Sequence, residues 1–278
     1  MDNIEIVNLV PKFLAFYEKA KSANGDMDST FKLWEEHYNF AALPPVEERS
    51  EMARKMLEDA WDQYELSIPQ LEAFQPDEQA ISNAMKELKQ LLRCDEDISI
   101  AVVYYVGAFE GNAFVAPSSD GRIALCLSIE TGDSDIVLAH EMAHIVHSKT
   151  ANLSMEWERS IASTVLQEGL AMRASQQIVP GYPDEAYSDH KPGWLETAAS
   201  KGTAILTGIL PHLEDSSNEA LQQFIFGKGT TGIDREAYYA GWVLVEALLN
   251  EGVSFQEIAS IPEDQMPDYV RQNLKKLI

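Results

Sequence analysis

Apolar side chains recur every three or four residues through most of the first third of the chain. That spacing is typical of amphipathic helices, so the sequence predicts a mostly helical N-terminal region over residues 1–95. The expected helices carry several aromatic residues, which at this spacing predict a packed core. The stripes that carry the expectation are Phe13, Tyr17 and Ala20; Phe31, Trp34 and Tyr38; Met52, Met56, Ala60 and Tyr64; and Ile81, Met85, Leu88 and Leu92.

The pattern changes after this region. Residues 98–106 form a run rich in Val, Ile and Tyr, which predicts a buried strand. Residues 112–116 and 122–129 are two further short apolar runs with turn residues between them, which predicts an antiparallel hairpin. Strands followed by more helical sequence predict a mixed α+β unit, and the edge of its sheet could hold an extended peptide through main-chain hydrogen bonds.

A helix with metal-binding potential follows the strands. Residues 136–148 contain His140-Glu141-x-x-His144, and the Asp-Ser-Asp sequence at 133–135 supplies residues that helix N-caps prefer. Positions four apart on a helix differ by about 40° around its axis, so both histidines can reach one metal ion. Glu141 is turned by about 100° from His140, where a carboxylate can take a proton from a metal-activated water. The alternative is a helix whose histidines are ordinary core residues.

A third ligand decides between these alternatives. Glu168 lies on the next expected helix, residues 154–175, which can fold back to face the histidines. Gly169 beside it removes a side chain where two helices approach closely. An exposed helical glutamate is the plainer interpretation of Glu168. The competing carboxylates, near the start of the same helix, are Glu156 and Glu158.

On these residues the chain resembles the gluzincin metallopeptidases, in which His-Glu-x-x-His is followed on a second helix by a glutamate ligand. It is particularly similar to predicted zinc-dependent proteases with a Glu-Gly-Leu-Ala signature, matched here by residues 168–171, a group long labelled only as a domain of unknown function. The resemblance covers roughly residues 98–250. It implies that zinc is bound by His140, His144 and Glu168, with Glu141 as the base.

The resemblance also implies a zincin-like α+β fold. In it a small antiparallel or mixed sheet packs on the His-Glu helix, between mostly helical N-terminal and C-terminal regions. The expected division is a helical region over residues 1–95 and a metallopeptidase domain over residues 96–278. A metzincin would need glycine at 147 and histidine at 150, where this chain has His147 and Thr150.

Two positions near the site depart from a simple match. Thermolysin-like gluzincins carry an acidic residue one turn after the glutamate ligand, where it bonds a zinc histidine, but this chain has Met172 there. A metal-bound histidine needs such a partner, so another group must supply it. His147 lies one turn beyond His144, and we assign it to the outer part of the site or to the surface rather than to the ligand set.

Two weaker similarities concern the substrate. Residues 107–112 are similar, with one insertion, to the aminopeptidase strand in which a glutamate binds the free amino group of the substrate, and this implies such a role for Glu110. Asn112 and Ala113 lie in a segment that also looks like the substrate-aligning edge strand of thermolysin-type enzymes. The two similarities favour different substrate classes, so endopeptidase and aminopeptidase action both stay open.

A tyrosine pair opens a later expected helix over residues 234–246. The resembled family carries Tyr-x-x-Gly at a similar place, matched by Tyr238 and Gly241. A tyrosine hydroxyl near the metal can donate a hydrogen bond to the oxyanion of a tetrahedral intermediate. Tyr238 is therefore the expected oxyanion donor, with Tyr239 as the second choice and simple packing as the alternative.

The charge narrows the range of partners. The 278 residues carry a net charge of −24, which opposes binding to nucleic acid or to an anionic membrane. Two cysteines are too few for a disulfide framework. The first residues contain neither a basic region nor a long apolar run, so we expect no signal peptide and no membrane anchor. The expected location is the cytoplasm.

Together these features predict a zinc-dependent peptidase that hydrolyses peptide bonds in a peptide or protein substrate, with Glu141 as general base. The alternative from another functional class is a non-catalytic binding or regulatory module that retains a gluzincin fold. A helical protein with a chance His-Glu-x-x-His motif is the third possibility.

Overall fold

The computed structural model describes residues 2–23, 25–43, 47–111, 113–118, 121–130, 134–154 and 158–278. The chain forms two compact units, which we describe separately. The first comprises Met1–Ile81 and Asp97–Ser134, and the second comprises Ser82–Glu96 and Asp135–Ile278. Helices dominate and one small sheet is present, which confirms the mixed α+β class.

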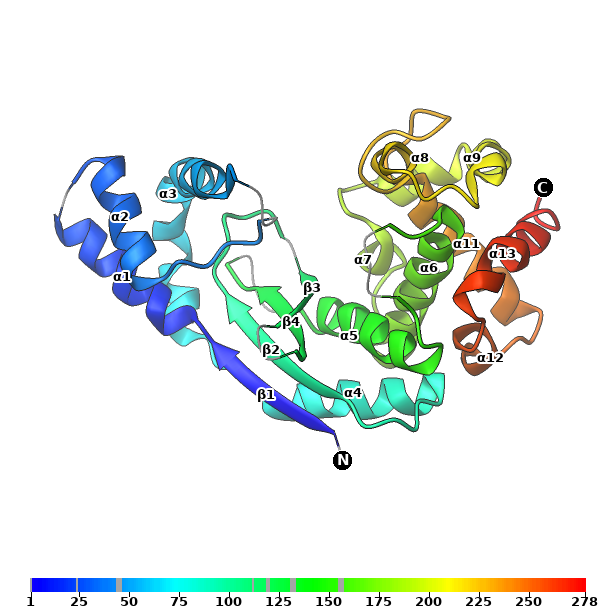
Figure 1. Cartoon of the computed structure of the whole chain (residues 1–278), viewed down its shortest axis with the longest axis horizontal. Coiled ribbons are helices and arrows are strands. Elements are labelled where there is room, and N and C mark those ends of the chain that lie inside the picture. Colours follow the sequence, from blue (N-terminus) through cyan, green and yellow to red (C-terminus); the bar gives the residue numbers. More distant parts are fainter. Residues whose placement is uncertain are drawn as a thin grey trace. The chain divides into compact units, whose positions relative to one another are not determined.

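The sheet belongs to the first unit. Its strands are β1 (Asn3–Asn8), β2 (Ser99–Tyr105), β3 (Phe114–Pro117) and β4 (Ile123–Ser128), in the order β1-β2-β4-β3 (Figure 1). β2 pairs in parallel with both β1 and β4, whereas β3 and β4 form the antiparallel hairpin predicted from the sequence. β1 was not predicted, because its partner strand begins at Ser99, far along the chain.

Helices with aromatic faces pack in the same unit. They are α1 (Val10–Ala23), α2 (Met27–His37) and α3 (Arg49–Ala73), close to the predicted stripes. α4 (Glu78–Leu92), which has no aromatic residue, begins in the same unit. Phe13 is fully buried and packs edge-on against Tyr38 and Tyr64. These aromatic residues form a core, as their spacing predicts.

The second unit is helical, and α6 (Ile161–Ile178) lies at its centre (Figure 1). α6 packs against α5 (Asp135–Thr150), α11 (Glu236–Asn250) and α13 (Met266–Leu274). Every residue from Ile161 to Ser175 is buried, so α6 is a core helix with no solvent-facing side along this length. The remaining elements are α7 (Glu185–Ser188), α8 (Trp194–Ala199), α9 (Gly202–Ile209), η1 (Leu210–His212), α10 (Asn218–Leu221), η2 (Gln222–Phe226), α12 (Phe255–Ala259) and η3 (Glu263–Gln265).

Helix α6 begins later than the sequence predicts. Its N-cap is Ser160, whose side chain accepts a hydrogen bond from the backbone N–H of Ser163. A side-chain oxygen that accepts a hydrogen bond from a free N–H of the first turn marks the residue at which a helix begins. Glu158 therefore precedes α6, and Glu156 lies outside the described residues.

Helices α6 and α11 touch through their backbones at two glycines. A Cβ atom placed on Gly169 would lie 2.3 Å from the carbonyl oxygen of Gly241, and one placed on Gly241 would lie 2.3 Å from the carbonyl oxygen of Val165. No side chain fits at either position. The close approach expected at Gly169 is therefore present, and its partner is the glycine of the Tyr-x-x-Gly sequence.

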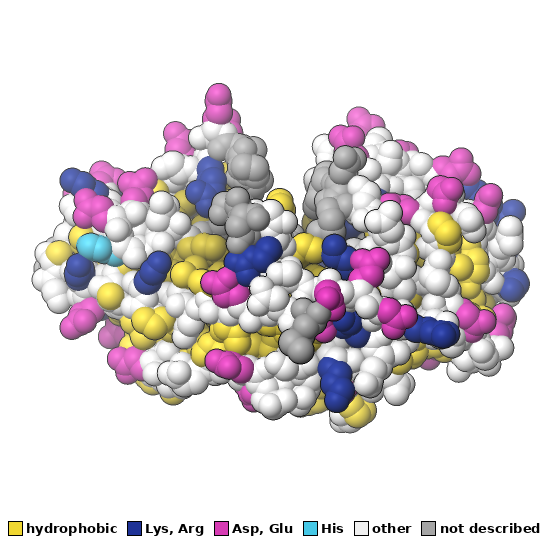
Figure 2. All heavy atoms as spheres, turned by 60° about the horizontal axis from the view of Figure 1, so that its bottom comes forward, with side chains coloured by type: hydrophobic (Ala, Val, Ile, Leu, Met, Phe, Trp, Pro, Cys, Tyr) yellow, Lys and Arg dark blue, Asp and Glu magenta, His cyan; other side chains and the backbone are white. Residues whose placement is uncertain are grey.

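Within the described parts of the chain, no helix is long and apolar enough to cross a membrane. On the face shown in Figure 2, acidic side chains lie among lysines and arginines rather than in one continuous patch.

Candidate metal centre

Helix α5 presents both motif histidines on one side. The helix begins at Asp135, an acidic residue of the kind favoured in a first turn, whereas Asp133 lies outside the described residues. Ala139, Met142 and Ala143 are buried between and beside the histidines and fix the rotation of the helix. His140 and His144 are then left partly exposed, with their Nε2 atoms 3.2 Å apart.

Glu168 faces them from the centre of α6. Only 5 % of this residue is exposed, so it is not the exposed helical glutamate that the sequence allows as an alternative. A carboxylate this deep in a core helix needs positively charged, hydrogen-bonding or metal partners. Its Oε2 atom lies 3.4 Å from Nε2 of His140 and 3.3 Å from Nε2 of His144.

The three donor atoms have the spacing of a tetrahedral metal site. Donors about 2.05 Å from one tetrahedral zinc ion lie about 3.4 Å from one another. The separations between the His140, His144 and Glu168 donors are 3.2, 3.3 and 3.4 Å. This cluster could therefore hold a metal ion, and two imidazoles with one carboxylate form a donor set that zinc accepts.

The charges in the cluster are strongly coupled. Burial lowers the pKa of His140, but the hydrogen bond to Glu168 and the charges of Glu141 and Glu168 outweigh it and leave the pKa raised. Burial raises the pKa of Glu168, but His144 and His140 hold it well below the usual value. The Glu168 carboxylate is therefore ionised at neutral pH and attracts a positive charge. That charge can be a protonated imidazole, or a metal ion that takes the place of the proton.

Glu141 and Tyr238 border the cluster. Glu141 is partly exposed and is not one of the clustered donors. Burial raises the pKa of Tyr238, and the charges of Glu168 and Glu141 raise it further. The Tyr238 hydroxyl therefore keeps its proton at neutral pH and can act as a hydrogen-bond donor near both carboxylates.

Tyr239 points elsewhere. It packs with Trp194, Ala198 and Ile205, and its hydroxyl oxygen lies 2.6 Å from where a Cβ on Gly202 would be. Of the two tyrosines, Tyr238 is the one on which the charges of Glu168 and Glu141 act.

His147 and Met172 do not take part in the cluster. His147 is buried rather than on the surface, and neither ring nitrogen has a hydrogen-bond partner among the described residues. Burial, with smaller contributions from His144 and Arg159, lowers its pKa to about 3, so it is neutral. Met172 is buried against Tyr187 and Trp242, so this position supplies no partner for a zinc histidine.

Arg159 is a site residue that sequence reasoning missed. Its Nη2 atom lies 3.7 Å from Oε1 of Glu168, the oxygen that faces away from the histidines. Arg159 immediately precedes the N-cap of α6, where the helix dipole disfavours a cation. That misplaced charge is the one local signal that could have indicated a buried acidic partner.

The predicted substrate residues belong to the first unit. Glu110 is exposed, and its Oε2 atom accepts a hydrogen bond from the backbone N–H of Ala108 within its own loop. Ala113 is partly buried immediately before β3. Asn112 lies outside the described residues. Their part in substrate binding stays a prediction.

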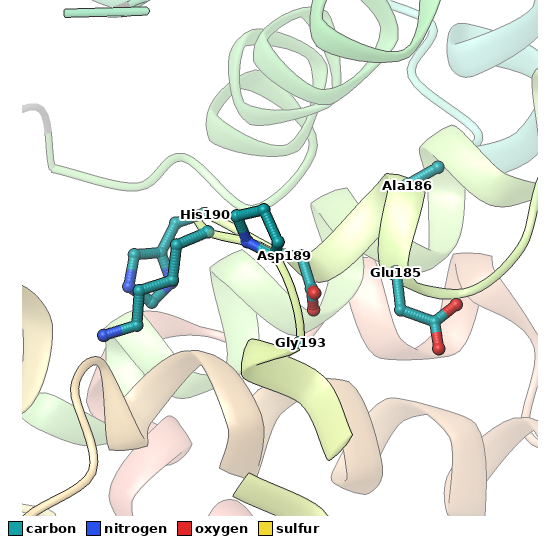
Figure 3. Close-up of a pocket in the computed structure, with 7 residues that line it drawn as sticks. Glu185, Ala186, Asp189, His190 and Gly193 are labelled. Carbon is teal, nitrogen blue, oxygen red and sulfur yellow. The ribbon is translucent and has the colours of Figure 1, made fainter. Parts of the chain in front are cut away.

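A surface depression occurs elsewhere in the second unit, around α7 and the start of α8 (Figure 3). Two of its charged side chains, Asp189 and Lys191, already have internal partners. The Asp189 carboxylate accepts hydrogen bonds from the backbone N–H groups of Trp194 and Leu195, and Lys191 is paired with Asp234. We assign it no chemistry.

No protein-family model matches the chain, and neither a curated protein nor a solved structure matches it. What the structure itself provides is the cluster of His140, His144 and Glu168, which could hold a metal ion.

Proposed function

We propose that this chain is a zinc-dependent peptidase of the gluzincin type. The observation that carries the proposal is the convergence of a buried glutamate on two histidines with the donor spacing of a tetrahedral metal. A zincin-like arrangement of the sheet and the His-Glu helix is part of the same proposal. The substrate is a peptide or protein.

The chain's own residues divide the chemistry between them. His140, His144 and Glu168 would hold the zinc ion, which supplies a Lewis acid that polarises a carbonyl and lowers the pKa of water to about 7. Glu141 accepts the proton of the attacking water and returns it to the amine nitrogen as the C–N bond breaks. Tyr238 donates a hydrogen bond to the developing oxyanion.

The number of ligands favours a hydrolase over a non-catalytic module. Structural zinc sites usually have four protein ligands, whereas catalytic sites have three and keep one position for water or substrate. The cluster found among the described residues has three members, and His147 is not one of them. A module with purely structural zinc fits this donor set less well.

Replacing Glu168 with alanine should remove most bound zinc, because the two remaining histidines cannot hold the ion alone. We expect the affinity for zinc to fall by at least about a hundredfold, measured by competition with a chromophoric chelator and by plasma mass spectrometry. Glu158→Ala, at the exposed carboxylate before α6, is the matched control and should bind zinc like the wild type. An unchanged zinc content in Glu168→Ala would assign the third ligand elsewhere.

Replacing Tyr238 with phenylalanine should lower kcat by roughly 10²–10³-fold with little change in KM, because the lost hydroxyl acts on the oxyanion and not on bound substrate. The assay is hydrolysis of a quenched-fluorescent peptide library. Tyr239→Phe removes the neighbouring hydroxyl, which faces Gly202, and should leave kcat nearly unchanged. Equal effects of the two substitutions would remove Tyr238 from the oxyanion role.

A further inference from the structure

The two oxygens of Glu168 have different partners. Oε2 faces both histidines at 3.3–3.4 Å, whereas Oε1 faces the guanidinium of Arg159 at 3.7 Å. The side chain of Glu168 is 7 % exposed and that of Arg159 is 29 % exposed. This ion pair is therefore partly shielded from solvent, where it is stronger than a surface pair.

Arg159 is itself held in place. Its Nε atom donates to Oγ1 of Thr164 at 3.3 Å, and its Nη1 atom donates to Oε1 of Gln167 at 3.2 Å. Both acceptors lie on α6, the helix that carries Glu168, so guanidinium and carboxylate share one rigid support. The forked donors of arginine suit this arrangement because each nitrogen can serve a different acceptor.

A chain of hydrogen bonds continues from Gln167 into the C-terminal part of the second unit. The Nε2 atom of Gln167 donates to Oγ of Ser163 at 2.7 Å, and Oγ of Ser163 donates to Oε1 of Glu263 at 3.1 Å. The other oxygen of Glu263 accepts from the backbone N–H of Ser154 at 2.9 Å. Arg159 is thus fixed by a connected network and does not depend on one contact.

We propose that Arg159 is a positioning residue that holds Oε1 of Glu168 away from the metal, so that Glu168 binds through Oε2 alone. This inference rests on the proposed metal site. A carboxylate with both oxygens free can bind a metal through one or both of them. Binding through one oxygen leaves more of the coordination sphere open for water and a substrate carbonyl, as a catalytic site requires.

The test uses the whole 278-residue chain loaded with Co²⁺ in place of zinc. The intensity of the visible Co²⁺ absorption falls as the coordination number rises, so it reports whether Glu168 binds through one oxygen or two. Arg159→Met should weaken this absorption and raise the zinc affinity by roughly tenfold, measured by chelator competition, because Glu168 gains a second bond to the ion and a neighbouring positive charge is removed. Arg159→Lys keeps the charge but loses the forked contacts, and should give intermediate values in both measurements.

Arg271→Met is the matched control, because it removes an arginine paired with exposed Glu214 in the same unit. It should leave both readouts at their wild-type values. Circular dichroism and thermal unfolding without metal verify that each variant is folded; if Arg159→Met is not folded, Arg159→Lys decides. Wild-type absorption and affinity in the folded Arg159 variants would overturn the positioning role alone. A wild-type protein that binds neither Co²⁺ nor zinc would instead overturn the metal site, and the positioning role with it.

Discussion

Replacing Glu141 with glutamine should remove peptide hydrolysis while leaving the zinc content unchanged. Glutamine has nearly the same shape as glutamate but cannot accept the proton of the attacking water or return it to the leaving amine. General acid–base catalysis contributes about 10²–10⁴-fold to rates, so we expect kcat to fall by at least this factor. Because Glu141 is not among the clustered donors, the loss should not come from loss of metal.

Two measurements on the same preparation separate these effects. Plasma mass spectrometry gives the zinc per chain, and cleavage of a peptide library gives the rate. Unchanged zinc with lost cleavage supports the base role, whereas parallel loss of both would place Glu141 in the metal site itself. Full activity in Glu141→Gln would remove the residue from the mechanism.

The elements that the sequence predicts well are those specified by local patterns. The strands β2, β3 and β4 and the helix α5 follow from runs of β-branched residues, turn residues and helical spacing within one segment. The cluster of His140, His144 and Glu168 was also predictable, because an i, i+4 pair fixes two donors and a buried metal needs a third.

The parts that escaped prediction depend on distant partners. β1 is a six-residue segment whose pairing with β2 joins Asn3 to Ser99, and no local pattern shows such a contact. Arg159 is likewise an ordinary charged residue until α6 is known to begin after it and to turn Glu168 inward. Sequence spacing indicates which residues can reach a metal but does not show which cation holds the second oxygen of a ligand.

Gly169 lies between these two cases. Its small size predicts a close helix contact, but the other helix could not be identified from the sequence. The structure gives α11, with Gly241 opposite Gly169. Tyr238 is one turn before Gly241 on the same helix, so the glycine contact brings the tyrosine towards Glu168. The stability of this helix crossing and the geometry of the proposed site are therefore linked.

Replacing Gly169 or Gly241 with alanine should destabilise the protein by about 2 kcal/mol or more. A new Cβ atom would lie 2.3 Å from a backbone carbonyl oxygen, and backbone atoms cannot move aside as a flexible side chain can. A clash this close with backbone atoms belongs at the upper end of the overpacking range, about 3 kcal/mol or more, while alanine regains about 1 kcal/mol of helix propensity. The clash outweighs the gain, and the unfolding midpoint should fall by roughly 4–8 °C.

Thermal unfolding followed by circular dichroism measures this effect, with Gln177→Ala on an exposed position of α6 as the control. The double variant Gly169→Ala, Gly241→Ala gives the sharper result. Once the first alanine has forced the helices apart, the second has less to displace, so the double variant should lose less stability than the sum of the two single variants. The separation should also move Tyr238 and so lower hydrolysis. Losses that simply add would mean that the two glycines do not meet at one contact.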